Sequence, residues 1–577
     1  MTNDAASTPR TSASGTPAPR TPAPRTPTPI DAIAEDWVLT LADLDPTVAT
    51  WIGIPGRLDE YGDLSPTGHA RYIDEVTRVI ALLDETDAVD DVDWVTKTDL
   101  GADLQLTVEE SEAGLWMRDL NVIASPAQGL RDVLDLMPTA SAEHWTNIAG
   151  RLRNLPAAID GYIQSLRAGI DRQVTPAKRQ VREVLAQARK HEAADGFFFE
   201  FTAGAQLDDG SALPESVTAD LASGAIASAG AYGVLAAFLE NELLPAATES
   251  DAVGRELYAL QSRRFLGATI DLDETYEWGI QELARMTAEQ ESIANEIMPG
   301  ASVAEAIALL DADPARTLHG TAALQEWMQK LSDTAVAELA ESHFDIPDPI
   351  KRLECLIAPT KEGGIYYTSP SDDFSRPGRM WWSVPEGVTE FNTWRETTTV
   401  YHEGVPGHHL QLGQAVYNRA KLNTWRRQLA GTSGHAEGWA LYAERLMQQL
   451  GYLDDPGDRL GMLDGQRMRA ARVVLDIGVH LGKPRLDGSG VWDFDYAFEF
   501  MKANVNMNEP FVRFEVNRYF GWPGQAPSYK VGQRIWEQLR DDFQAREGDD
   551  FDIRAFHRRA LDIGGVGLDT LRAALLG

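Results

Sequence analysis

Histidines gather in one short window of this sequence. The chain of 577 residues has 11 histidines in all, and a random spread would place about one or two of them in a window of this length. Imidazole binds divalent metals and transfers protons near neutral pH, so such a cluster marks a region where chemistry is expected. The clustered residues are His402, His408, His409, His435 and His480.

The segment TTTVYHEGVPGHHLQL, residues 397–412, places Glu403 directly after His402. A histidine beside a glutamate, followed shortly by another histidine, is how a helix presents two imidazoles to a zinc ion with a carboxylate next to them. The carboxylate can take a proton from water while the ion lowers the pKa of that water and polarises a carbonyl. We therefore predict a centre for Zn²⁺, or another divalent metal, with Glu403 as general base.

The spacing of these histidines departs from the usual zinc helix, in which the two ligands are four residues apart. Here His402 is followed by His408 after six residues and by His409 after seven. On a regular helix, the sixth residue lies about 240° around the axis and the seventh about 10 Å along it. Pro406 and Gly407 lie between them, and a proline inside a helix bends or breaks it. We predict a distorted turn that brings His408 back toward His402, with His409 as the alternative ligand.

A third ligand is expected in the segment GTSGHAEGWALYAERLMQQL, residues 431–450. Many zinc peptidases take a carboxylate about 25–35 residues after the second histidine and leave a fourth position for water. Glu437 fits this spacing and is our predicted ligand. His435 is a weaker candidate, and Glu444 could orient a ligand histidine from behind.

The segment RMRAARVVLDIGVHLG carries Arg472, Asp476 and His480 four residues apart, on one face of a helix that is otherwise apolar. Buried charges need partners, so one interpretation is a structural network of these three side chains, with Asp476 near the metal or its ligands. The alternative is that His480 donates to the oxygen of the reacting carbonyl.

The segment FEVNRYFGWPGQAPSYKVGQRIW adds groups suited to binding a substrate. Tyr519 and Tyr529 offer phenol donors, and Arg518 and Arg534 could hold a carboxylate. Each of the four could instead simply pack.

The elements that position these residues are predicted to be helices. From Ile30 onward apolar residues recur at three- and four-residue spacing. We predict one mainly α domain over 30–577, with catalytic helices at about 395–482 and a late tyrosine loop at 515–535. The Ala-rich stretch 214–247 is predicted to be a helical hairpin or one long helix. Aromatic pairs around a turn cluster predict a β-hairpin or small sheet near 363–388.

Composition limits the partners of the chain. The formal charge is −36, and without a basic stripe we expect no nucleic-acid or anionic membrane partner. We find no stretch of roughly 20 apolar residues, the length that would span a membrane. The single cysteine, Cys355, fits a reducing compartment and a cytoplasmic location. Residues 1–29 are rich in Pro, Thr and Ala and predict a disordered tail.

Four motifs together resemble a known family. HEGVPGHHLQ, EGWALYAERL, RVVLDIGVH and RYFGWPGQAPSYKVG are similar to those of a bacterial family catalogued as domain of unknown function 885, over most of the chain after the tail. That family in turn resembles the carboxypeptidase Taq metallopeptidases and, more distantly, thimet oligopeptidase and neurolysin. The resemblance implies a helical metallopeptidase-like fold with a deep cleft. It also implies that His408 and Glu437 are ligands and that Tyr529 stabilises the tetrahedral intermediate.

The predicted function is zinc-dependent hydrolysis of short peptides. The resemblance favours action from the carboxyl end, with an arginine holding the terminal carboxylate. The alternatives are an oligopeptidase or dipeptidase, or a metal- or peptide-binding protein with little turnover. The sequence does not predict an oligomeric state.

Overall fold

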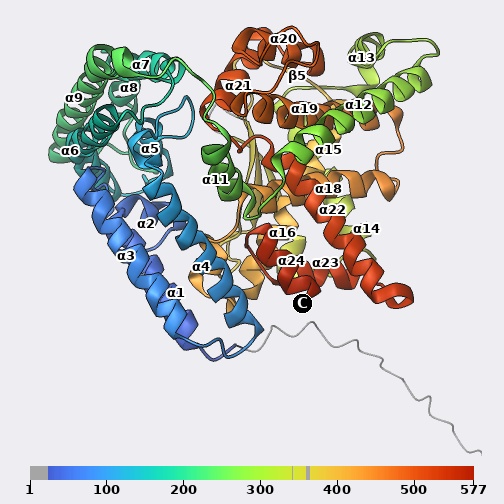
Figure 1. Ribbon diagram of the computed structural model, residues 1–577, viewed down its shortest axis with the longest axis horizontal. Helices are drawn as coiled ribbons and strands as arrows, with labels where there is room; N and C mark the ends of the chain where they lie inside the picture. The colour runs from blue at the N-terminus through green and yellow to red at the C-terminus, as the bar shows by residue number, and fades with distance from the viewer. Residues whose placement is uncertain (1–23, 341, 359–363) are drawn as a thin grey trace, which may run out of the picture.

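Helices make up most of this protein. The computed structural model describes residues 24–340, 342–358 and 364–577. Over these ranges the chain forms many helices and two small sheets, which confirms the predicted mainly α class. The helices form two lobes that lie side by side (Figure 1). We call residues 29–246 the first lobe and residues 255–577 the second lobe.

The first helices of the first lobe begin at capping residues that can be identified in the sequence. Thr28 and Asp31 form a capping box at the first of them, with Pro29 at its first position, and Asp90 caps the fourth. Their apolar faces enclose a small core around Trp37. These elements are α1 (Pro29–Leu44), α2 (Pro46–Ile52), α3 (Pro66–Glu85), α4 (Asp91–Glu112) and the 3₁₀ helix η1 (Leu115–Met117).

The rest of the first lobe is a helical layer built around two long helices, α6 and α9, that pack along each other. The Ala-rich stretch forms one long helix rather than a hairpin. The elements are α5 (Pro126–Asp132), η2 (Val133–Leu136), α6 (Ala142–Arg172), α7 (Lys178–Glu192), α8 (Phe197–Ala203), α9 (Glu215–Phe238), the π turn η3 (Leu239–Leu243) and α10 (Leu244–Ala246).

That long helix corrects one expectation from the sequence. Within the described residues, Glu215–Ala246 is long and apolar enough to cross a membrane by length and composition alone, with a mean hydropathy of 1.5. The sequence analysis found no such stretch. In the fold, α9 packs against α6, α7 and α8, and 56% of its most apolar window is buried. The packing is that of a core helix.

The second lobe is organised around α19, whose residues from Ala470 to His480 are all buried. Helices α12, α15, α20, α21 and α22 pack against it. The helices of this lobe are α11 (Arg255–Leu266), α12 (Leu272–Ile297), α13 (Val303–Asp311), η4 (Pro314–Arg316), α14 (Thr321–Leu339), η5 (Asp348–Lys351), α15 (Thr393–Glu403), α16 (His408–Tyr417), η6 (Asn418–Ala420), α17 (Thr424–Gln428), α18 (Ser433–Gln449), α19 (Pro456–His480), α20 (Phe494–Asn504), α21 (Glu509–Gly521), α22 (Ser528–Glu547), η7 (Gly548–Asp550), α23 (Ile553–Asp562) and α24 (Leu568–Leu576).

Two small sheets precede the helix that carries His402. In the larger one, β4 pairs antiparallel with β3 and parallel with β2, in the order β2-β4-β3. The two strands β3 and β4 confirm the small sheet predicted near 363–388, of which residue 363 lies outside the described residues. The strands are β2 (Leu353–Ile357), β3 (Ile365–Thr368), β4 (Gly378–Trp382) and, in the smaller sheet, β1 (Thr317–His319) paired with β5 (Glu390–Asn392).

Of the predicted tail, residues 1–29, residues 1–23 lie outside the described residues. The described part, residues 24–29, contacts the helical body. Arg25 pairs with Asp90 at 2.8 Å between Nε and Oδ2, and also with Asp31 and Asp93.

Candidate metal centre

The segment between His402 and His408 is not helical. Helix α15 ends at Glu403 and α16 begins at His408. The Gly407 N–H donates to the Tyr401 carbonyl at 3.0 Å and so closes the turn. A Cβ atom on Gly407 would lie 1.8 Å from the His402 carbonyl oxygen, so only glycine fits this close approach. The chain interrupts the helix around Pro406, as the spacing predicts.

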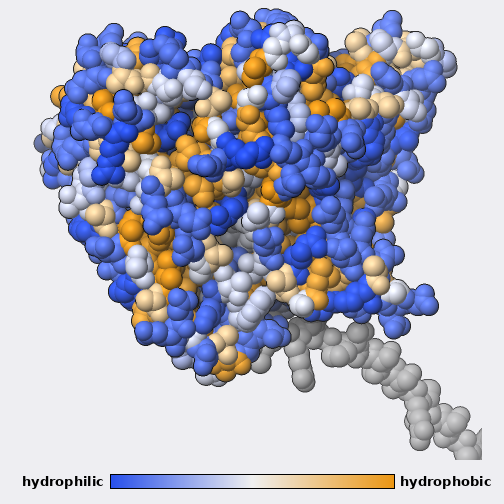
Figure 2. Space-filling view, viewed as in Figure 1, coloured by the Kyte–Doolittle hydropathy of each residue, from blue (hydrophilic) through white to orange (hydrophobic). Residues whose placement is uncertain are grey.

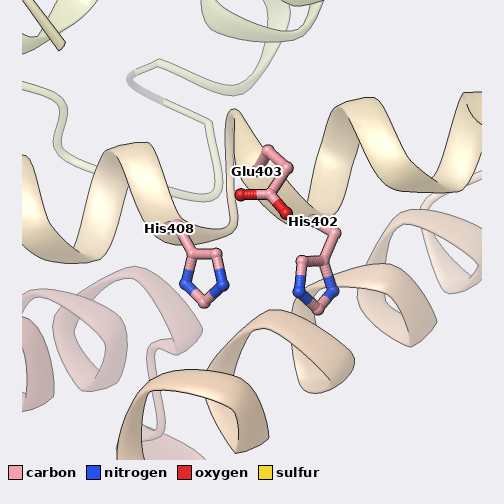
Figure 3. A group of neighbouring side chains, drawn as sticks. All are labelled: His402, Glu403 and His408. Carbon is pink, nitrogen blue, oxygen red and sulfur yellow. The ribbon is translucent and has the colours of Figure 1, made fainter. Parts of the chain in front are cut away.

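This turn brings His402, Glu403 and His408 together (Figure 3). One nitrogen or oxygen atom from each lies within 4.8 Å of those of the other two. The two imidazole rings are nearly perpendicular, with centroids 4.8 Å apart. All three residues are buried. The arrangement suits a metal ion, since both rings point into the same space.

The second histidine of this group is His408 and not His409. The His409 Nε2–H donates to the Ile350 carbonyl at 2.6 Å. Its Nδ1 accepts from the Tyr367 hydroxyl at 2.9 Å. Both nitrogens are therefore committed to the sheet side of α16, and His409 is a structural residue.

Glu437 of α18 joins the group from a separate helix. Its Oε2 lies 3.3 Å from His402 Nε2 and 3.8 Å from His408 Nε2. Zinc ligands at about 2.0–2.2 Å from the ion are about 3.3–3.6 Å apart when they form a tetrahedron. Glu437 Oε2 and Glu403 Oε2 are both buried and make no hydrogen bond. Two imidazoles and a carboxylate of this geometry fit zinc, and either glutamate could complete the set.

A chain of hydrogen bonds behind His402 fixes its ring. The His402 Nδ1–H donates to Glu444 Oε1 at 2.7 Å. Glu444 Oε2 accepts from the Gln466 amide at 3.0 Å, and Gln466 Oε1 accepts from Lys530 Nζ at 2.7 Å. Lys530 also pairs with Glu282 at 3.0 Å. A carboxylate on the far nitrogen is the common way of orienting a metal-binding histidine, as predicted for Glu444.

Burial and nearby charges act against each other in this pocket. Burial alone would lower the pKa of His402, but the neighbouring carboxylates of Glu437 and Glu444 outweigh it and raise that pKa to about 10. Burial would raise the pKa of Glu437, but His402 and His408 hold it down at about 2. Burial lowers the pKa of His408. The pocket thus concentrates carboxylates around one imidazolium, a charge arrangement that a divalent cation can replace.

Tyr529 lies beside this group because α18 and α22 cross at very short range. A Cβ atom on Gly438 would lie 2.4 Å from the Gly532 carbonyl carbon, so two glycines make the crossing. Burial raises the pKa of Tyr529, and the nearby Glu437 carboxylate raises it further. The late tyrosine predicted from the sequence is therefore close to the candidate ligands.

Arg469 is a residue of this site that the sequence analysis missed. Its guanidinium carbon lies 5.7 Å from the centre of the Tyr529 ring, and its charge lowers the pKa of both Glu437 and Glu444. Its Nε makes no hydrogen bond, and no carboxylate among the described residues pairs with it. Four arginines lie on α19, so type alone could not single it out. The one signal near it in the sequence is Arg472, a predicted polar residue of the same helix three positions later.

The polar residues of α19 do not form the network that one interpretation predicted. Arg472 pairs with Glu515 at 2.7 Å, whereas Asp476 accepts from Tyr258 and from the Gly524 N–H. The His480 Nε2–H donates to the Tyr519 carbonyl at 2.9 Å. The ring is fully buried and its Nε2–H is bound to the backbone, which favours a structural role for His480.

The predicted substrate-binding residues are also occupied. Arg518 pairs with Glu515 at 3.1 Å, and Arg534 pairs with Glu274 at the surface. The Tyr519 hydroxyl donates to Glu515 and accepts from Arg472 Nε.

His435 packs its ring against Trp536, with centroids 5.4 Å apart. Burial lowers the pKa of this imidazole to about 4. The contact makes His435 part of the core that supports α18.

The comparisons with known proteins give a family and a fold. Residues 46–575 match the model of the family described as "Bacterial protein of unknown function (DUF885)". A "putative lipoprotein" from Colwellia psychrerythraea superposes with a TM-score of 0.82 at 23% identity, covering 95% of this chain and 98% of that one. A "putative lipoprotein of unknown function" from Shewanella oneidensis gives 0.74 at 18% identity, covering 95% and 100%. At these identities the likeness shows the fold alone. No curated protein matches the sequence.

Proposed function

The chain belongs to the bacterial family described as protein of unknown function DUF885, and for this member we propose zinc-dependent hydrolysis of peptide bonds in short peptides. The observation that supports it most is the meeting of His402, His408 and Glu437 beside Glu403. The ligands come from three elements, and a carboxylate without a partner stands next to them. Buried carboxylate oxygens in a purely structural cluster usually have hydrogen-bond partners.

In this proposal His402, His408 and Glu437 hold the metal and Glu403 acts as general base. Bound zinc would polarise the substrate carbonyl and lower the pKa of the attacking water. Glu403 Oε2 makes no hydrogen bond within the protein, so it is free to take the proton of that water and pass it to the leaving amine. The Tyr529 phenol would donate to the carbonyl oxygen as negative charge develops on it.

Arg469 would bind the free carboxylate of the substrate, in place of the predicted Arg518 and Arg534. It is a cation without an ion-pair partner among the described residues, and it lies against Tyr529. Guanidinium groups bind carboxylates through paired hydrogen bonds. This assignment favours carboxypeptidase action, in line with the resemblance to carboxypeptidase Taq. We also propose a cytoplasmic location, which the single cysteine supports.

Glu403→Gln tests the mechanism. We expect zinc to remain bound and hydrolysis of a set of blocked and free dipeptides to fall by at least about 100-fold, since general-base catalysis contributes about 10²–10⁴-fold. Undiminished hydrolysis would remove the mechanism. Zinc binding without turnover in the unaltered protein would instead favour the alternative, a metal- or peptide-binding protein on this scaffold.

Arg469→Gln tests the direction of attack. We expect kcat/KM to fall about 10- to 100-fold for peptides with a free carboxyl end, the usual loss of a hydrogen bond to a charged group. Peptides ending in an amide should be unaffected. Arg459→Gln, on the same helix and paired with Glu296 at the surface, is the matched control. Equal losses on both peptide classes would favour an oligopeptidase.

A further inference from the structure

A second cavity of about 550 Å³ lies between the two lobes. Residues of α4 and η1 form its wall in the first lobe, and residues of α11 and the connection after α21 form its wall in the second. Figure 2 shows the molecule hollowed between the lobes on the face drawn there. Cavities of roughly 300–1,000 Å³ at such junctions are the usual sites for small ligands. We call this space the interlobe cavity.

The interlobe cavity contains a cation without a counter-ion. Arg118, directly after η1, lines it, and its guanidinium makes no hydrogen bond or ion pair with any residue that the structure describes. Burial lowers the pKa of Arg118. The other arginine of the wall, Arg264, is neutralised by Asp103 and by Glu110 at 2.6 Å. An uncompensated charge in a crowded place is unfavourable unless an anion joins it.

The same wall carries acceptors without donors. Gln261 Oε1 is buried and makes no hydrogen bond. Asp119 is an exposed residue of this wall, and no cation of the described chain pairs with it. The side-chain oxygens of Gln261 and Asp119 can therefore accept hydrogen bonds from N–H groups of a ligand, and the Asp119 carboxylate favours a cationic donor.

Aromatic rings complete the lining. Trp116 stacks on His69 with centroids 4.4 Å apart, and Phe265 meets Trp522 edge to face at 5.4 Å. Such walls bury an apolar side chain while the few polar groups fix its orientation.

We infer that the interlobe cavity binds a small zwitterion, an α-amino acid or short peptide with an apolar side chain. Its carboxylate lies on Arg118 and its ammonium or amide N–H groups meet Asp119 and Gln261. This site is separate from the metal centre, and the inference does not rest on the proposed function.

Two cavities that share lining residues lie between the interlobe cavity and Glu437 of the candidate metal centre. A cavity of about 180 Å³ shares Asp103 and Arg264 with the interlobe cavity. That space in turn shares residues 430–432 with a cavity of about 350 Å³ that reaches Glu437. The zwitterion site thus lies at the far end of a row of adjoining cavities.

Isothermal titration calorimetry of the full chain carrying Glu403→Gln tests this inference without substrate turnover. The probes are L-phenylalanine, glycyl-L-phenylalanine and the amide of each. We expect the free acids to bind at the interlobe cavity, in addition to any binding at the metal centre, and the interlobe binding to weaken about 10- to 100-fold on Arg118→Gln or on amidation, the usual loss of a charge-assisted hydrogen bond. The acid that binds more tightly identifies the ligand as amino acid or peptide.

Two controls separate this site from the metal centre and from misfolding. Arg153→Gln, at an exposed position of α6, and Glu437→Gln should leave the interlobe binding unchanged. Arg118→Gln should not lower Tm, because it removes an uncompensated charge. Equal affinity in Arg118→Gln, loss of binding on Glu437→Gln instead, or no binding of either acid at millimolar concentration would overturn the inference.

Discussion

Replacing Glu444 by glutamine should weaken zinc binding about 10- to 100-fold, the usual effect of removing the partner behind a metal-binding histidine. That corresponds to about 1.4–2.8 kcal/mol. The substitution preserves size, so the introduced amide oxygen can still accept from His402 Nδ1 in place of Glu444 Oε1 at 2.7 Å. What it loses is the charge that makes His402 a stronger ligand.

The hydrogen bonds around Glu444 do not suit the amide that Glu444→Gln introduces. The new amide nitrogen would face the Gln466 nitrogen, which now donates to Glu444 Oε2 at 3.0 Å. Gln466 cannot reverse its amide without losing the bond from Lys530 Nζ to its oxygen at 2.7 Å. Two donors would therefore oppose each other in a buried place, which costs about 1–3 kcal/mol.

The assay is a competition titration of zinc against a chromophoric chelator at constant pH. Glu289→Gln is the matched control, because Glu289 pairs with Arg445, the residue after Glu444, and not with His402. We expect the control to bind zinc as the unaltered protein does. Unchanged zinc affinity in a folded Glu444→Gln variant would refute the reasoning, and so would an equal loss in the control.

Two further predictions concern stability. Gly407→Ala forces a Cβ atom against the His402 carbonyl oxygen and should destabilise the fold by about 1–3 kcal/mol, with loss of zinc. Gly230→Ala, exposed on α9 with open space around it, should leave Tm unchanged or raise it; equal Tm losses would contradict this. Burial lowers the pKa of His557 to about 4, so the stability from its neutral form is present above about pH 6.5 and is lost as the pH falls toward 4. Between pH 7.5 and 5.0 the free energy of unfolding in urea should fall in both proteins, but by about 2 kcal/mol less in His557→Gln than in the unaltered protein. An identical pH dependence in the two proteins would contradict the lowered pKa of His557.

Much of the helical scaffold could be predicted because local signals specify it. Capping residues and apolar spacing mark where α1 and α4 begin, and the aromatic pairs mark β3 and β4. The meeting of His402 with His408 could also be anticipated, because Pro406 and Gly407 cannot continue a helix.

The choice between neighbouring residues could not be predicted. His408 and His409 have the same chemistry in sequence, and only the contacts of His409 with Ile350 and Tyr367 exclude it. The sequence singles out Arg518 because it lies near the tyrosine loop, but an ion pair with Glu515 occupies it. Which arginine stays unpaired depends on contacts between residues far apart in the chain, and these contacts cannot be read from a single sequence.

The broken helix at residues 404–407 places the candidate metal centre between two helix ends rather than on the flank of one helix. Helix α15 ends at Glu403, so its last carbonyl groups carry partial negative charge toward the site. Helix α16 begins at His408, whose ring stands at the positive end of a second dipole. The first end favours a cation by about 0.3–1 kcal/mol, and the second disfavours a proton on His408. A negative helix end and a positive helix end thus meet at this site, the first favouring a cation and the second keeping a nitrogen of His408 free of its proton.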